Sequence, residues 1–248
     1  MKCVVLAAGI SSRLYPLTLS TPKCLLKVGE YTILERTIRN VLLHKISQFV
    51  IVTGFQAEMI TDFVRVAFPS LEVEFILNAR FRDTNNAYSL ALANQALAGE
   101  EMLLLDGDIV FDHRILSGLL SASYENCLAV RRSTDSDEEE VKVAVDEEWR
   151  VLQVGKEVSM EFTLGESIGI ERFSVEGTKR LFEVLSRRIV VEKRENEFYE
   201  ASFQELVDTG TPIFAVDTRH LPCVEIDTLE DLREAREIAV RKLDGVRR

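Results

Sequence analysis

The sequence predicts an α/β fold, with one domain over residues 1–248 and a mixed, mostly parallel central sheet flanked by helices. In the first half of the chain, short apolar runs alternate with segments whose apolar residues recur at helical spacing. This alternation is typical of a parallel sheet covered on both faces. In the second half, several strand-like runs follow one another directly, which favours a mixed sheet. The chain shows no linker, repeat or low-complexity tract that would divide it.

The first half predicts strands and helices in strict alternation. Strands are expected over residues 3–8, 48–54, 71–77 and 101–111. Helices are expected over residues 31–46, 56–68, 85–97 and 113–123. Pro69 requires the second helix to end before it, and Asn85 is a favoured residue at the start of the third.

The second half predicts a run of strands, then helices, then two short strands and a last helix. The first strands are expected over residues 126–132, 139–146, 149–155 and 166–173, with turn residues at 146–148. Two helices over 178–188 and 199–207 follow, then strands over 212–217 and 223–227, and a helix over 228–243. The acidic run 135–140 is interpreted as a solvated loop.

Composition excludes several classes of protein. The formal net charge is −11, so the chain lacks the basic character of a general nucleic-acid binder. No apolar run approaches the roughly 20 residues of a membrane span, and we expect no membrane segment. The four cysteines have no CxxC spacing, which favours reduced, buried thiols in a cytoplasmic protein. The sequence leaves a homodimer open.

The segment after the first strand, "LAAGISSRLYPLTLSTPKCLL", has the residue types of a phosphate-binding loop. It leaves the carboxyl end of a strand, where open parallel sheets bind ligands. Small residues allow close approach to the backbone, serines offer hydroxyls, and the two cations Arg13 and Lys23 suit phosphate oxygens. Pro16 and Pro22 stiffen the segment. The spacing matches neither a P-loop nor a GxGxxG fingerprint.

This segment resembles the signature of nucleotidyltransferases that join nucleoside triphosphates to sugar 1-phosphates or phosphoalcohols. The resemblance continues in order through "NNAYSLALA", "LLLDGDIVF", "VLQVGKE" and "PCVEIDTLEDLREA", and so covers nearly the whole chain. Within that superfamily the chain is most similar to the small CTP-dependent cytidylyltransferases for phosphocholine and inositol 1-phosphate. The resemblance implies a Rossmann-like fold, with a nucleotide-binding part over about residues 1–112 and an acceptor-binding part over about 113–248.

The resemblance also implies roles for residues. Arg13 would bind the β- and γ-phosphates, Lys23 would lie over the α-phosphate, and Lys156 would bind the acceptor phosphate, so that these three are the expected catalytic cations. The expected nucleotide contacts are Leu6, Ala7, Ala8, Gly9, Ser11, Ser12, Arg13, Lys23, Asn85 and Asp106. The expected ligands of Mg²⁺ are Asp108, Asp227 and Glu225.

The residue chemistry supports this reaction independently. In nucleotidyl transfer a phosphate oxygen attacks the α-phosphorus, and both partners are anions, so catalysis is mainly alignment and charge neutralisation. Mg²⁺ takes hard oxygen ligands, typically one or two carboxylates plus substrate phosphates. Because the acceptor phosphate is already ionised, no side-chain nucleophile is required, and none of the three histidines has a partner suggested by a motif.

The resemblance to the phosphocholine enzymes implies a cage of aromatic side chains and a carboxylate around the acceptor, and this chain carries that cage only in part. A quaternary ammonium group is recognised by aromatic faces, but the single tryptophan, Trp149, lies in a turn between predicted strands. A second part of the cage would fall at "FYEAS", where Tyr199 is aromatic and is followed by Glu200. Carboxylates suit a polyol phosphate instead, and the expected acceptor contacts are Lys156, Glu140, Tyr199 and Glu200, with Glu139 beside them. The sequence therefore favours CTP and inositol 1-phosphate as substrates.

Alternatives remain at several positions and for the function. Asp106 and Asp108 also suit a strand-end turn, Asn85 also suits a helix cap, and either Asp227 or Thr228 suits the cap of the last helix. The acceptor could be phosphocholine, or the enzyme could be a sugar-1-phosphate nucleotidyltransferase using UTP or dTTP. A binding module without turnover and a Rossmann oxidoreductase are more distant alternatives.

Overall fold

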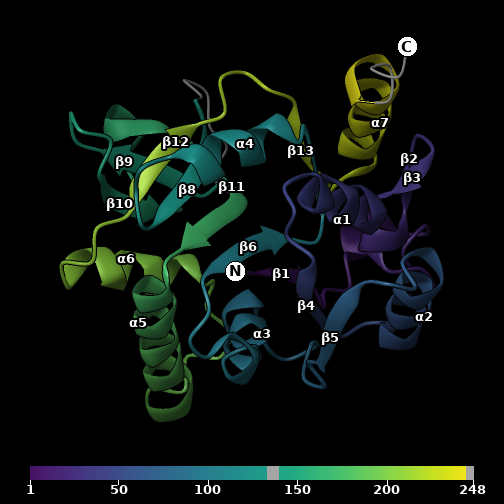
Figure 1. The fold of residues 1–248 in the computed structure, drawn as a ribbon, viewed down its shortest axis with the longest axis horizontal. Coiled ribbons are helices and arrows are strands. Elements are labelled where there is room, and N and C mark those ends of the chain that lie inside the picture. The colour runs from purple at the N-terminus through teal and green to yellow at the C-terminus, as the bar shows by residue number, and fades with distance from the viewer. Residues whose placement is uncertain (133–139, 244–248) are drawn as a thin grey trace.

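A computed structural model describes residues 1–132 and 140–243 of the chain. Figure 1 shows one α/β unit in which helices surround a central sheet. The parallel part of that sheet consists of β5 (Glu72–Leu77), β4 (Gln48–Thr53), β1 (Lys2–Ala7) and β6 (Met102–Asp106), in this spatial order. β1 therefore lies between two parallel neighbours, and its carboxyl end opens at the middle of the sheet. The predicted α/β class and mixed sheet are confirmed.

The second half of the chain extends this sheet with antiparallel strands. β11 (Thr163–Phe173) runs antiparallel to β6 and continues beyond it to pair with β9 (Lys142–Val145), which pairs with β10 (Val151–Gly155). The other edge of β11 pairs with β8 (Cys127–Arg132), and β8 pairs in parallel with β12 (Phe214–Asp217). β11 starts at Thr163, three residues before the predicted strand, because its first residues pair with both β9 and β8.

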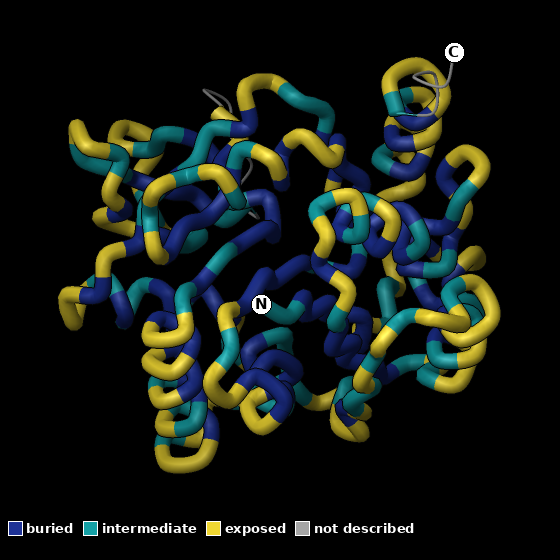
Figure 2. Tube along the Cα trace, viewed as in Figure 1, coloured by how far each residue is buried: buried dark blue, intermediate teal, exposed yellow. Residues whose placement is uncertain are grey.

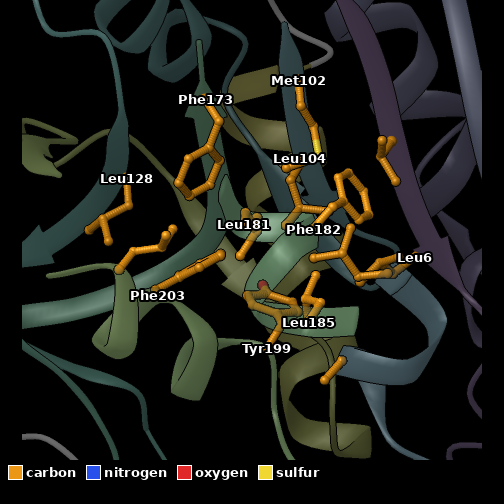
Figure 3. Packing of buried hydrophobic residues seen from close by; sticks show 14 of the residues in the cluster. Leu6, Met102, Leu104, Leu128, Phe173, Leu181, Phe182, Leu185, Tyr199 and Phe203 are labelled. Carbon is orange, nitrogen blue, oxygen red and sulfur yellow. The ribbon is translucent and has the colours of Figure 1, made fainter. Parts of the chain in front are cut away.

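Helices cover both faces of the sheet, which is why its central strands β1, β4 and β6 are apolar along nearly their whole length. Residues such as Val4 and Leu6 pack with α3 (Asn86–Leu92), α5 (Val175–Ser186) and α6 (Glu200–Asp208), and Figure 3 shows part of this cluster. Cys3 and Val5 face the opposite layer of α1 (Ile33–Leu43), α2 (Ala57–Ala67) and α4 (Arg114–Ser121). Figure 2 shows the buried strands inside and the exposed helix faces outside.

Two small sheets lie beside the main one. β2 (Lys27–Val28) pairs with β3 (Tyr31–Thr32), and β7 (Ile109–Phe111) pairs with β13 (Cys223–Glu225). The predicted strand 101–111 therefore breaks in two, and its second piece leaves the main sheet to meet a segment more than 100 residues away. Gly107 allows the break, because a Cβ there would lie 2.4 Å from the Leu6 carbonyl oxygen.

The last helix closes the fold. α7 (Leu229–Ile238) packs its apolar residues against Leu14, in the segment after β1, and against Val110 and Val224 of the β7–β13 pair. Thr228 caps it: the Thr228 hydroxyl accepts from Asp231 N–H, and the Asp231 carboxylate accepts from Thr228 N–H. In the described part of the chain, no helix has both the length and the apolarity to cross a membrane. The four cysteines are buried thiols, as predicted.

Candidate active site

A large cleft opens at the carboxyl ends of β1 and β6. Its volume is about 1020 Å³, close to the upper limit of the usual range for a ligand site. One wall comes from the loop after β1 and from the start of α3, and the other from β11, the segment before α6, and Lys156. The β7–β13 pair and the start of α7 complete it. The cleft therefore joins the two parts of the chain that the sequence assigned to different substrates.

The loop after β1 presents its backbone to the cleft. Ala8, Gly9, Ser11, Ser12 and Arg13 line the cleft, whereas Ala7 is buried behind them. Ser11 takes a left-handed conformation, with φ 54°, and its carbonyl oxygen accepts a 2.7 Å hydrogen bond from the Thr18 hydroxyl. Leu6 and Asp106, at the ends of β1 and β6, lie at the floor.

A backbone hydrogen bond also holds this loop against the segment that follows β4. The Ala8 carbonyl oxygen accepts a hydrogen bond from Phe55 N–H at 3.1 Å. Gly54 lies so close that a Cβ would be 2.6 Å from the same oxygen. The predicted loop residues are thus brought together at one edge of the sheet, and the loop is held by backbone contacts that no spacing rule identifies.

Asp108, Glu225 and Asp227 meet across the β7–β13 pair. Asp108 precedes β7, Glu225 ends β13, and the backbone bond from Ile226 N–H to the Asp108 carbonyl oxygen, at 3.0 Å, fastens the two segments. One ligand oxygen from each carboxylate lies within 4.8 Å of the others. Asp108 Oδ1 is buried without a hydrogen-bond partner. Three convergent carboxylates and an unsatisfied oxygen fit a hard divalent cation such as Mg²⁺.

Lys23, from the segment after β1, joins these carboxylates. Its ammonium lies 2.7 Å from Asp108 Oδ2 and 2.9 Å from Asp227 Oδ1, and its side chain is only 11% exposed. Arg13 Nη2 lies 3.0 Å from Asp227 Oδ2. Because Thr228 is the cap of α7, the Asp227 side chain is directed to these cations instead. The alternative in which Asp227 caps the helix is therefore excluded.

Burial and charge set the ionisation of this group. Burial opposes ionisation of Asp227, but the Lys23 and Arg13 cations outweigh it, and the pKa of Asp227 is lowered. Burial, with repulsion from Asp108 and Asp227, raises the pKa of Glu225 to about 8. Burial opposes the charge on Lys23 as well, yet the carboxylates on both sides raise its pKa. The site therefore combines fixed positive and negative charges, as phosphate and metal chemistry needs.

The far end of the cleft carries Lys156, Glu140 and Glu200. Lys156 Nζ lies 4.4 Å from the centre of the Phe198 ring, and both residues line the cleft. Glu200, the first residue of α6, is buried, and its Oε2 atom has no hydrogen-bond partner. Burial raises the pKa of Glu200 to about 7, although Lys156 opposes this shift. Glu139 lies outside the described residues.

Tyr199 requires a correction. The sequence predicts that it contacts the acceptor, but its side chain is 0% exposed and packs in the core, with its hydroxyl 2.9 Å from Asp106 Oδ2. Phe198, one residue earlier, is the aromatic side chain at the cleft. The physical reason is the position of α6, which begins at Glu200 and directs its apolar face, with Tyr199, into the sheet. Trp149 packs against Arg132, with the guanidinium carbon 4.8 Å from the ring centre.

The cleft also has lining residues that the sequence analysis did not single out, among them Phe198, Glu166 and Gly169. Glu166 is paired with Arg131, and burial raises its pKa to about 7. Gly169 has φ +69°, and a Cβ there would lie 2.5 Å from Asp106 Oδ2. A glycine within the apolar strand pattern "ESIGIERF" was the available signal for this close approach.

Asn85 and Asn86 have structural partners as well as a place in the cleft. Asn85 is the N-cap of α3, and Asn86 Oδ1 accepts from Tyr199 N–H. Both residues line the cleft. The cap reading of Asn85 is confirmed, and its contact with a nucleotide stays a prediction.

The fold and the cleft together define a class of protein: an α/β domain with a cationic, phosphate-suited loop and a carboxylate cluster at the carboxyl edge of a parallel sheet. Residues 3–153 match the MobA-like NTP transferase domain family. The chain belongs to this family, which confirms the expected nucleotidyltransferase resemblance.

Individual proteins similar to this chain also carry the names of nucleotidyltransferases. The chain is 30% identical to a choline-phosphate cytidylyltransferase of Streptococcus pneumoniae over 50% of this chain and 52% of that protein. It is 23% identical to a CTP:phosphoglutamine cytidylyltransferase of Campylobacter jejuni, over 94% of this chain and 98% of that protein. Its fold is similar to that of the inositol-1-phosphate CTP transferase of T. maritima, with a TM-score of 0.83, 22% identity, and 99% and 97% of the two chains covered.

Several matches extend over only part of the relative. For three relatives of about 30% identity, the matching region is 21% to 52% of the relative's own length.

Proposed function

We propose that this chain transfers CMP from CTP to inositol 1-phosphate, giving CDP-inositol and pyrophosphate, with Mg²⁺ as cofactor. The observation that carries the proposal is one cleft lined by Arg13, the carboxylate cluster and Lys156, with Lys23 paired to two of the cluster's carboxylates. The cytidylyltransferase names of the relatives support CTP as donor. The division into a nucleotide part over 1–112 and an acceptor part over 113–248 remains part of the proposal.

The residues of the chain suit an in-line displacement. A phosphate oxygen of the acceptor forms the new bond to the α-phosphorus of CTP, and the bond to the bridging oxygen of pyrophosphate breaks. Ser11, Ser12 and Arg13 would bind the departing phosphates, and Lys23 would neutralise charge at the α-phosphate. Lys156 would hold the acceptor phosphate.

The carboxylates of Asp108, Glu225 and Asp227 would hold Mg²⁺, which supplies neutralisation of phosphate charge when bound.

The acceptor end supports a polyol. Glu140, Glu166 and Glu200 offer oxygens for hydroxyl donors, and the single tryptophan packs elsewhere, against Arg132. One observation favours phosphocholine as a second candidate: Phe198 and Glu200 place an aromatic ring and a carboxylate on the same wall, as a cationic headgroup requires.

The test is pyrophosphate release with Mg²⁺, crossing CTP, UTP and dTTP with inositol 1-phosphate, phosphocholine, phosphoglutamine and glucose 1-phosphate. The proposal expects the largest kcat/KM for CTP with inositol 1-phosphate, and loss of metal-dependent turnover in a folded Asp108→Ala variant. A preference for phosphocholine would identify the second candidate. CTP binding without pyrophosphate from any acceptor would instead indicate a binding module.

A further inference from the structure

Tyr199 stands between the two walls of the cleft. Its sequence neighbours Phe198 and Glu200 line the acceptor wall, while its own ring is buried. Figure 3 shows the ring beside Phe203 and Leu185 in the core, and the centres of the Tyr199 and Phe203 rings are 5.0 Å apart. A buried tyrosine hydroxyl requires a hydrogen-bond partner. The partner of Tyr199 is a residue that itself lines the cleft.

Tyr199 makes one hydrogen bond to the floor of the cleft and one to the wall that contains the start of α3. Its hydroxyl donates to Asp106 Oδ2 at 2.9 Å, at the carboxyl end of β6. Its backbone N–H donates to Asn86 Oδ1 at 2.9 Å, at the first residue of α3. Both acceptors also line the cleft. Tyr199, which lies between two residues of the acceptor wall, is therefore held by two side chains that line other parts of the cleft.

The residues before Tyr199 are fastened to the same wall. Asn85 N–H donates to the Glu195 carbonyl oxygen at 3.0 Å, and Arg80 makes a two-pronged ion pair with the Glu195 carboxylate. The ion pair is on the surface and is expected to contribute little. The two partly buried hydrogen bonds of Tyr199 are the stronger restraint.

We propose that Tyr199 is a positioning residue that couples the two substrate sites. It holds Phe198 and Glu200 in register with Asp106 and Asn86, so that a nucleotide contacting either of these side chains alters the order of the acceptor wall. Coupling of this kind is reciprocal: if the nucleotide strengthens acceptor binding, the acceptor strengthens nucleotide binding by the same factor. The effect on the acceptor rests on the proposed function, whereas the effect of nucleotide on the wall does not.

The test compares Tyr199→Phe with a packing control. Tyr199→Phe removes the hydroxyl and keeps the ring in the core, while Phe203→Leu loosens the same cluster on the same helix and keeps the hydroxyl. One readout is hydrogen–deuterium exchange of the backbone over residues 195–208, with and without CTP and Mg²⁺. The other is the KM of each substrate in the pyrophosphate assay.

In wild type, CTP is expected to slow exchange over residues 195–208. Tyr199→Phe should lose most of that slowing and raise the acceptor KM about ten-fold, as expected when a buried acceptor oxygen loses its hydrogen-bond partner. Its kcat and its affinity for CTP without acceptor should change much less, whereas the KM of CTP at saturating acceptor should rise by a factor similar to that of the acceptor KM. Phe203→Leu should lower the melting temperature yet keep both the CTP-dependent slowing and the acceptor KM.

Two results would overturn the proposal. One is a Tyr199→Phe variant that keeps the wild-type response to CTP and the wild-type acceptor KM. The other is the same change in both variants, which would make the role of Tyr199 purely one of packing. If no acceptor supports turnover in wild type, the proposed function fails, and the exchange experiment still decides the coupling.

Discussion

Replacing Lys23 with methionine removes one ammonium group and keeps most of the side-chain stem. That ammonium lies between two carboxylates, 2.7 Å from Asp108 Oδ2 and 2.9 Å from Asp227 Oδ1. At an effective dielectric constant of about 20, each contact represents roughly 6 kcal/mol of gross attraction, and burial of the charges cancels much of it. Removing one partner of a buried pair costs about 3–5 kcal/mol.

The lower end of that range applies here, because the Asp108 and Asp227 side chains are 25% and 32% exposed. A loss of about 3 kcal/mol lowers the melting temperature by roughly 6–12 °C in a chain of this size. The assay is thermal unfolding of the nucleotide-free protein without divalent ions. Lys27→Met is the matched control, because Lys27 is exposed, and it should melt close to wild type.

The same assay with Mg²⁺ tests whether lysine and metal use the same carboxylates. Without Lys23, the cluster is more negative, so Mg²⁺ should raise the melting temperature of Lys23→Met more than that of wild type. Adding Asp108→Asn to Lys23→Met should recover part of the lost stability by relieving repulsion. A Lys23→Met variant that melts at the wild-type temperature, or equal Mg²⁺ stabilisation of both proteins, would refute the reasoning.

Three further predictions follow from the cleft. Gly169→Ala should destabilise the protein and weaken CTP binding, since it adds a Cβ 2.5 Å from Asp106 Oδ2 at φ +69°. Gly99→Ala is the control for the backbone conformation alone, because Gly99 has φ +78° and nothing within 4 Å of the added Cβ. If urea unfolding shows the same loss of unfolding free energy in both variants, the clash with Asp106 is contradicted. The pKa of Glu200 is raised to about 7, so the folded state binds its proton more tightly than the unfolded state, and stability falls as pH rises from about 4.5 to 7, by up to about 3 kcal/mol. Glu200→Gln should therefore gain stability relative to wild type between pH 5 and pH 8, and a constant difference across that range would show that Glu200 does not titrate there. Lys156→Ala should raise the acceptor KM at least about ten-fold, as for a lost charge-assisted hydrogen bond, with little change in the KM of CTP, and unchanged acceptor kinetics would place Lys156 outside the reaction.

Local patterns in the sequence determined most of the fold. Strand and helix periodicity placed β1, α1, β4 and α2 within a few residues, because each depends on the burial of its own faces. The phosphate-suited loop was visible for the same reason, since its small residues, hydroxyls and cations lie close together in the chain. Buried cysteines and the turn at 146–148 also followed from local chemistry.

The tertiary structure decided which distant side chains meet. Asp108 reaches Glu225 and Asp227 only because β7 leaves the main sheet at Gly107 and pairs with β13, a register that no local pattern specifies. The exchange of roles between Tyr199 and Phe198 has the same origin. Both residues lie in the segment that leads into α6, so the docking of α6 on the sheet determines which aromatic ring enters the core and which one lines the cleft.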